Sequence, residues 1–242
     1  MTPTHPRKFF WFSILITSLS ASLLCQGQES PTEESPSNGR PVKILYYQAP
    51  ANAPSEAYIY VGEKQVARTE LTCTSFSETF HIPQGKLRLS FLPKPLVDGE
   101  APESRPPVVN IPESWKKVLL LVIEHKQNRL MPIRVKAINA SDNAFGPGSI
   151  YMLNYSDLAI YGTMGTKKLQ LKPQSIQIFK KPIEKNGYYP VKLQSLVKGE
   201  TQPRRFIRQM WSNSDQVRNV LFIIPKPAPM HATYYCAPIR DF

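Results

Sequence analysis

The densest group of residues that could do chemistry lies between Pro203 and Arg218. Arg204, Arg205 and Arg208 stand there close to Trp211. Guanidinium groups bind carboxylate or phosphate oxygens bidentately and stack on aromatic rings, so this pattern predicts a site for an anionic ligand. Basic residues on strands also protect sheet edges and keep a protein in solution, and the sequence leaves that alternative open.

Groups for catalysis are sparse and scattered. His81, His125 and His231 have no spacing typical of metal ligands, and there is no C-x-x-C pair, nucleophile elbow or phosphate-binding loop. We therefore expect a protein that is not an enzyme and that carries no metal and no cofactor. A site assembled from residues far apart in the sequence is the alternative.

The N-terminal residues have the three-part plan of a secretory signal peptide. Arg7 and Lys8 precede Phe9–Leu24, which has no charged residue, and a polar run follows directly. We predict a signal peptide over residues 1–27 and an exported protein, periplasmic or at the cell surface if the host is bacterial. The alternative is that the segment stays uncleaved as a signal-anchor. No other stretch is long enough for a transmembrane helix, so none is expected in the mature protein.

The charge of the chain narrows the class of partner. Thirty Lys and Arg residues against 18 Asp and Glu residues give a formal net charge of +12. In the cell envelope, the anions available to such a protein are acidic polysaccharides, lipid phosphates and cell-wall polymers. Nucleic acid fits the charge but not the export signal, so we expect an anionic envelope polysaccharide or a protein partner instead.

Composition and periodicity predict an all-β fold. The 24 prolines would break long helices repeatedly. Alternating apolar and polar residues mark half-buried strands, for example Leu87–Phe91, Ile133–Ala137 and Tyr189–Leu193. Val118–Ile123 and Val220–Ile224 are continuous apolar runs, typical of central strands buried on both faces.

A faint internal repeat favours two tandem immunoglobulin-like β-sandwiches over one large sandwich. The first half opens at Val42 and ends on Val118–Ile123, and the second opens at Ile133 and ends on Val220–Ile224. Each half has about the length of one immunoglobulin-like sandwich. We expect a disordered spacer over residues 28–40, sandwiches over 41–130 and 131–228, and a C-terminal tail over 229–242.

Removal of the signal peptide would leave two cysteines, Cys73 and Cys236. In an oxidising compartment two such thiols tend to pair, and a bond would tie the C-terminal tail to the first sandwich. The alternative is one buried thiol and one on a mobile tail.

Three phrases of the second half carry a family resemblance: Phe145–Ile150, Asn154–Ser156 and Leu169–Pro173. They resemble secreted bacterial β-sandwich domains of unknown function, including the periplasmic accessory (F-component) type of alginate acetylation. The resemblance implies an exported, non-catalytic module that works beside envelope polysaccharide or an assembly complex.

A second resemblance lies in the outline of the chain. Tandem sandwiches, basic charge and export together are similar to periplasmic pilus chaperones. This implies the alternative function, an assembly accessory or chaperone that pairs with its partner through an open strand edge.

Overall fold

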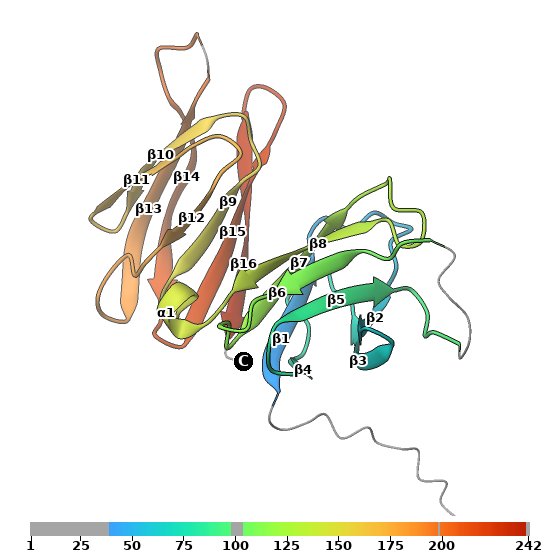
Figure 1. The fold of residues 1–242 in the computed structure, drawn as a ribbon. Helices are drawn as coiled ribbons and strands as arrows, with labels where there is room; N and C mark the ends of the chain where they lie inside the picture. The colour runs from blue at the N-terminus through green and yellow to red at the C-terminus, as the bar shows by residue number, and fades with distance from the viewer. Residues whose placement is uncertain (1–38, 98–103, 198, 241–242) are drawn as a thin grey trace, which may run out of the picture. The chain divides into compact units, whose positions relative to one another are not determined.

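The computed structural model describes residues 39–97, 104–197 and 199–240, all within one compact unit. The predicted signal peptide and nearly all of the predicted spacer lie outside these residues. The chain is all-β, and its strands form four four-stranded sheets arranged as two sandwiches (Figure 1).

The first sandwich consists of sheets A and B. The strand order of sheet A is β4-β1-β7-β8, and that of sheet B is β3-β2-β5-β6. The strands are β1 (Arg40–Tyr46), β2 (Glu56–Val61), β3 (Lys64–Glu70), β4 (Phe80–Ile82), β5 (Leu87–Leu92), β6 (Val108–Ile111), β7 (Val118–Glu124) and β8 (Ile133–Asn139).

The second sandwich follows the short helix α1 (Asp142–Phe145) and consists of sheets C and D. Sheet C has the order β12-β9-β15-β16, and sheet D has the order β11-β10-β13-β14. The strands are β9 (Ile150–Asn154), β10 (Ala159–Met164), β11 (Lys167–Leu171), β12 (Ile176–Phe179), β13 (Gly187–Leu196), β14 (Arg204–Asn213), β15 (Val217–Pro225) and β16 (Ala232–Arg240).

The two sandwiches have the same topology, because each strand of the second takes the place of the strand eight numbers earlier in the first. Even the one parallel pair of each sandwich corresponds: β1 with β7, and β9 with β15. The two continuous apolar runs form β7 and β15, which occupy corresponding positions in the two sandwiches. The chain is thus built as two copies of one strand plan.

The strand pairings place three segments differently from the sequence-based divisions. Ile133–Asn139, expected in the second sandwich, pairs with β7 and closes sheet A of the first. Ala232–Arg240, expected as a tail, pairs with β15 along its whole length. Arg40, expected in the spacer, begins β1 and is 1% exposed. A period of two identifies a half-buried strand but not the neighbour to which it is hydrogen-bonded.

Each sandwich has its own apolar core, and a third buried cluster involves sheets A and C. Leu119 and Leu121 of β7 lie in this third cluster with Val220 and Phe222 of β15, while the alternate residues of both strands face the sandwich cores. This confirms that the two continuous apolar runs are central strands buried on both faces. The outer faces of sheets B and D are therefore the two sheet faces that do not pack against another sheet.

Candidate functional site

The four residues singled out from the sequence all lie on β14, the edge strand of sheet D, but they do not share a face. Arg205 and Arg208 lie opposite Gln194 and Lys192 of β13, on the outer face of the sheet. Arg204 and Trp211 lie opposite the buried residues Ser195 and Tyr189, on the inner side. Directly opposite residues of antiparallel strands point to the same face.

A β-bulge sets this division. The register of β13 and β14 shifts so that Leu193 pairs with Ile207 while Gln194 pairs with Arg205, which leaves Phe206 as an extra residue. Strict alternation would have placed Arg204 on the same face of β14 as Arg208, because the two residues are four positions apart. With one residue inserted, Arg205 joins Arg208 instead.

The guanidinium of Arg204 is occupied by groups of the chain itself. Its Nε donates to Oε2 of Glu200 at 2.8 Å and its Nη2 to Oε1 at 2.7 Å, and its Nη1 donates to the carbonyl of Pro229 at 2.9 Å. The hydrogen bond with Glu200 raises the pKa of Arg204 and lowers the pKa of Glu200. Arg204 therefore ties the β13–β14 turn to the β15–β16 turn.

The outer face of sheet D carries a row of four residues, one on each strand, and three of them are cations. Thr163 of β10 lies directly opposite both Lys168 of β11 and Lys192 of β13, and Lys192 lies opposite Arg208 of β14. Neighbouring strands are about 4.8 Å apart, so the row extends over about 14 Å. Arg205 adds a fourth cation in the next row. We call Lys168, Lys192, Arg205 and Arg208 the basic face.

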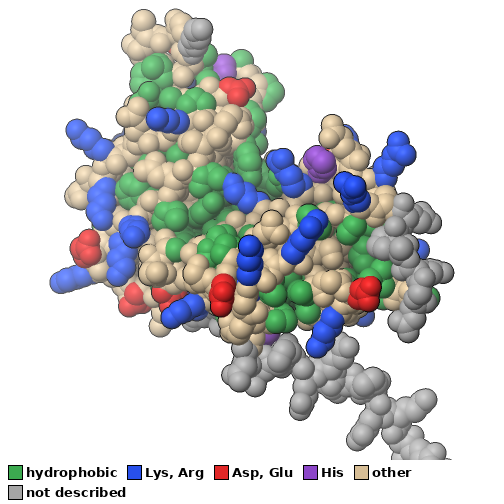
Figure 2. All heavy atoms as spheres, in the orientation of Figure 1, with side chains coloured by type: hydrophobic (Ala, Val, Ile, Leu, Met, Phe, Trp, Pro, Cys, Tyr) green, Lys and Arg blue, Asp and Glu red, His purple; other side chains and the backbone are tan. Residues whose placement is uncertain are grey.

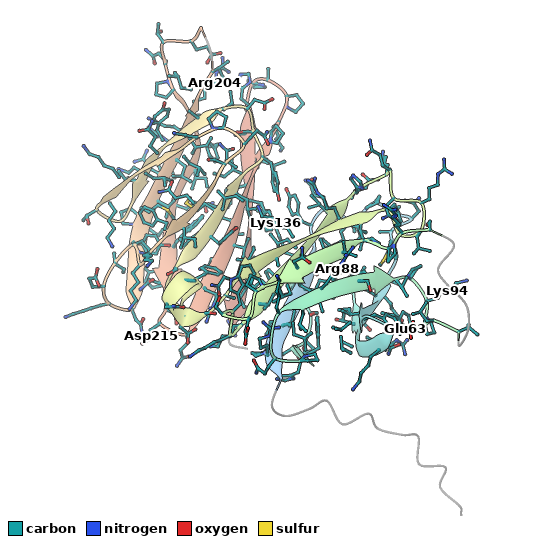
Figure 3. The ribbon with its side chains drawn as sticks, viewed as in Figure 1. Glu63, Arg88, Lys94, Lys136, Arg204 and Asp215 are labelled. Atoms are coloured by element: carbon teal, nitrogen blue, oxygen red, sulfur yellow. The ribbon has the colours of Figure 1, made fainter. Side chains whose placement is uncertain are left out.

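No acidic residue interrupts this face. The four strands of sheet D contain no Asp or Glu, and the acids of the second sandwich lie in its turns. Figure 3 labels Arg204 and Asp215 at opposite ends of the sandwich, where β14 begins and just beyond where it ends. All four cations are exposed, and none of them has an ion pair with a residue that the structure describes.

Close approach of two strands supports this arrangement. A Cβ at Gly162 of β10 would lie 1.9 Å from the carbonyl oxygen of Lys192. Only glycine lets β10 and β13 come this near to each other. Gly162 therefore helps to hold Lys192 level with Thr163 and Lys168.

The other face of β14 opens on a groove. Trp211 lines it together with Tyr234 of β16, and the cavity volume is about 500 Å³. Exposed Met210 also lines the groove and shares the outer face of β14 with Arg208. The groove and the basic face are therefore continuous over the edge of β14.

Sequence reasoning missed Lys168, Lys192 and Tyr234. Lys168 belongs to a basic doublet, and Lys192 alternates with apolar residues, but such signals occur on many strands. Their alignment with Arg208 depends on the strand order of sheet D, which joins residues far apart in the chain. Figure 2 shows Lys and Arg side chains over much of the surface, so charge alone does not mark the site.

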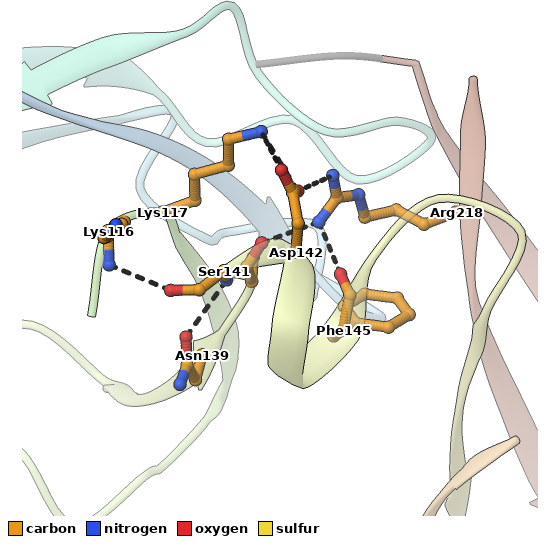
Figure 4. Close-up of polar contacts among 8 residues, drawn as sticks. Lys116, Lys117, Asn139, Ser141, Asp142, Phe145 and Arg218 are labelled. Atoms are coloured by element: carbon orange, nitrogen blue, oxygen red, sulfur yellow. Dashed lines mark hydrogen bonds and ion pairs between the residues drawn. The ribbon is translucent and has the colours of Figure 1, made fainter. Parts of the chain in front are cut away.

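A second charged cluster lies where α1 joins the sandwiches (Figure 4). Arg218, 2% exposed, donates through Nη1 to the carbonyls of Ala140 and Phe145 and through Nη2 to Oδ1 of Asp142 at 3.0 Å. Lys117 Nζ donates to the same Oδ1 at 3.1 Å.

The charges of this cluster satisfy one another. Partial burial raises the pKa of Asp142, but the hydrogen bonds and charges of Lys117 and Arg218 outweigh that effect and lower it. Because Arg218 is enclosed by carbonyl groups and a carboxylate, its donors are engaged within the protein and the cluster offers no open site.

Both cysteines within the described residues are free thiols, so the structure does not contain the disulfide between Cys73 and Cys236. Cys73 is exposed, whereas Cys236 lies in β16 at the groove, where its Sγ is 3.7 Å from Oδ1 of Asn219. Burial raises the pKa of the Cys236 thiol to about 11. It is therefore a neutral, weakly reactive thiol at neutral pH.

Within the described ranges, no three His, Cys, Asp or Glu side chains gather closely enough to hold a metal ion. No helix in the same part of the chain has the length and apolar character needed to cross a membrane.

No family model matches the sequence, and no curated protein matches it significantly. The resemblance to the alginate-acetylation accessory type therefore stays a prediction, and the site has to be interpreted from its own geometry.

Proposed function

We propose that this protein is an exported, non-catalytic binding protein of the cell envelope that holds an anionic polymer on its basic face. The observation that carries the proposal is the row of Lys168, Lys192 and Arg208, with Arg205 beside it, on four strands without an acid. An extended face with several cations in a row suits a polyanion better than a small ligand, which needs a concave pocket.

Electrostatics explains why the grouping matters. A single exposed ion pair contributes about 0–1 kcal/mol, because water and salt screen it. Several uncompensated cations on one face act together on a chain of anions and raise both its local concentration and its rate of association. Binding through this face should therefore weaken steeply as salt increases.

Two further lines support the proposal. The predicted signal peptide favours export to the envelope, where acidic polysaccharides and phosphate polymers are abundant. The second line is the form of the site, because an extended charged face on sheet D suits the binding of a polymer.

The test is a titration of the purified protein with polygalacturonate and with polyphosphate at low and at physiological salt. In the basic-face variant, Lys168, Lys192 and Arg208 are all replaced by Gln. We expect affinity to fall by about 10- to 100-fold, from three lost contacts of a fraction of a kcal/mol to 1 kcal/mol each.

The matched control replaces Lys64, Lys86 and Arg88, three exposed cations of the first sandwich, by Gln. It changes the net charge by the same amount and should leave affinity within about twofold of the unmodified protein. Equal losses in the two variants would reduce the effect to net charge and contradict the proposal.

One observation favours a second function, that of an assembly accessory. β14 and β16 are edge strands of ten and nine residues, each hydrogen-bonded to a neighbour on one side only. An extended peptide could add to either edge through main-chain hydrogen bonds. Peptide binding that survives high salt and persists in the basic-face variant would establish this function instead.

A further inference from the structure

The groove between β14 and β16 is lined by two aromatic side chains. Its apolar part consists of Trp211, Tyr234 and Met210, and Met210 is 60% exposed. The ring centroids of Trp211 and Tyr234 are 5.9 Å apart, and the ring planes are inclined at 42°. A pair of aromatic side chains around an open volume of about 500 Å³ offers a flat ligand an apolar contact on one face.

One side chain fixes both aromatic rings. Oε1 of Gln209 accepts hydrogen bonds from Nε1 of Trp211 at 3.2 Å and from the hydroxyl of Tyr234 at 2.6 Å. The polar tips of the rings are thereby satisfied within the protein, which leaves their faces for contact with a ligand. Rings held in place before binding lose little conformational entropy when the ligand arrives.

The rim of the groove is polar. Ser212 and Ser214 contribute hydroxyl groups, Asn219 an amide and Arg240 a guanidinium. Arg240 is exposed and has no ion pair with any residue in the described part of the chain. Donors and acceptors around an aromatic floor match a sugar ring, which has an apolar C–H face and a rim of hydroxyl groups, and Arg240 matches a carboxylate on that ring.

We infer that this groove binds one sugar ring of an acidic polysaccharide whose chain continues over the basic face. The inference rests on the proposed function and names its ligand class. Met210 connects the two regions, because it lines the groove and lies two residues from Arg208 on the same face of β14. A polymer seated on Arg208 reaches the groove by crossing the edge of a single strand.

Other polyanions fit the groove less well. Polyphosphate has no ring to place against Trp211 and Tyr234. Single-stranded nucleic acid stacks successive bases on a series of aromatic faces along a basic channel. This groove offers one inclined pair, closed at its tips by Gln209, and a rim suited to hydroxyl groups.

The test compares two carboxylate polymers of matched charge, polygalacturonate, which is made of sugar rings, and poly-L-glutamate, which has none. The protein is titrated with each at low and at physiological salt. We expect polygalacturonate to bind about tenfold more tightly than polyglutamate, the contribution of one well-placed aromatic contact. Trp211→Ala should abolish this preference and leave the affinity for polyglutamate unchanged.

Matched variants separate loss of the ring from loss of folding. Trp211→Phe keeps an aromatic face and should retain most of the preference, whereas Tyr234→Ala should lose it as Trp211→Ala does.

The outcomes distinguish this inference from the proposed function. Equal binding of the two polymers, unaffected by Trp211→Ala but lost in the basic-face variant, would overturn the inference and leave the proposed function standing. Tighter, Trp211-dependent binding of oligothymidylate would overturn it in favour of a nucleic acid. Failure of every polyanion to bind at low salt would overturn the proposed function, and the inference with it.

Discussion

Sheets B and D occupy the same place in two sandwiches of identical strand order, yet their outer faces use charge in opposite ways. On sheet B, Arg68 is held by Glu56 through two hydrogen bonds of 2.9 Å, and its guanidinium lies 5.5 Å from the ring centroid of Tyr58. On sheet D, Lys168, Lys192 and Arg208 stand in a row without an acid. Sheet B thus neutralises Arg68, although Arg88 of β5 is exposed there without an ion pair in the described residues, whereas sheet D presents a row of unpaired cations.

The chain also covers sheet B in part. The hydroxyl of Tyr60 accepts a hydrogen bond from the amide of Leu96 at 2.9 Å, so the segment after β5 packs on the outer face, and Tyr60 is only 3% exposed. On sheet D, Tyr188 and Met210 remain 75% and 60% exposed. The shared topology therefore explains the fold, and the residues at exposed positions explain why we assign binding to sheet D.

The largest effect should come from Gly162 of β10, because the strands of sheet B contain no glycine. Gly162→Ala places a methyl group against the Lys192 carbonyl, so β10 and β13 must separate. We expect a loss of about 3 kcal/mol in the free energy of unfolding, measured by urea denaturation. Gly62→Ala is the control: its φ is +61°, but no atom lies within 4 Å of the new Cβ, and the cost should be about 1 kcal/mol. Equal costs would show that the close approach of β10 and β13 is dispensable.

A single added carboxylate should remove the difference in charge pairing between the outer faces of sheets B and D. Thr163 lies between Lys168 and Lys192, so Thr163→Glu gives sheet D the kind of pairing that sheet B already has. Affinity for polygalacturonate, measured by titration, should fall about tenfold because two cations become engaged within the protein. Thr163→Gln introduces a side chain of nearly the same size as Glu but without its charge. This variant should bind polygalacturonate as tightly as the unmodified protein does. Similar affinities of the Glu and Gln variants would contradict the assignment of the basic face.

Local sequence predicted the features that depend on local composition. The apolar runs in β7 and β15 indicate strands buried on both faces, and the structure confirms it, because an uninterrupted apolar strand has no polar face to present to water. The all-β class with two sandwich-like domains is confirmed for the same kind of reason. Composition and periodicity are properties of the segment itself.

The site depended on features that no local pattern reveals. The bulge at Phe206 reverses which arginine shares a face with Arg208, and a single inserted residue leaves no mark in the spacing of apolar residues. Lys168 and Lys192 join Arg208 only because the sheet order brings β11, β13 and β14 to one surface. Pairings between distant segments therefore determine the site.

The smallest expected effect concerns the neutralised face of sheet B. The Arg68 hydrogen bond lowers the pKa of Glu56 below its ordinary value of 4.5. Since the folded pKa is the lower one, the stabilisation is fully present above the ordinary value and is lost as the pH falls through the folded pKa. Glu56→Gln should therefore lower the melting temperature slightly at neutral pH, and the difference from the unmodified protein should vanish as the pH falls through the folded pKa of Glu56.

The same variant tests whether one free cation is enough to create a binding face. Glu56→Gln releases Arg68 on sheet B, where Tyr58 is its near neighbour and no row of cations surrounds it. Affinity for polygalacturonate should rise by no more than about twofold, because an isolated exposed charge is largely screened. Glu63→Gln, which removes an exposed carboxylate without an ion pair in the described residues, is the control for net charge. A gain as large as the loss in the basic-face variant would mean that net charge, and not the row across sheet D, governs binding.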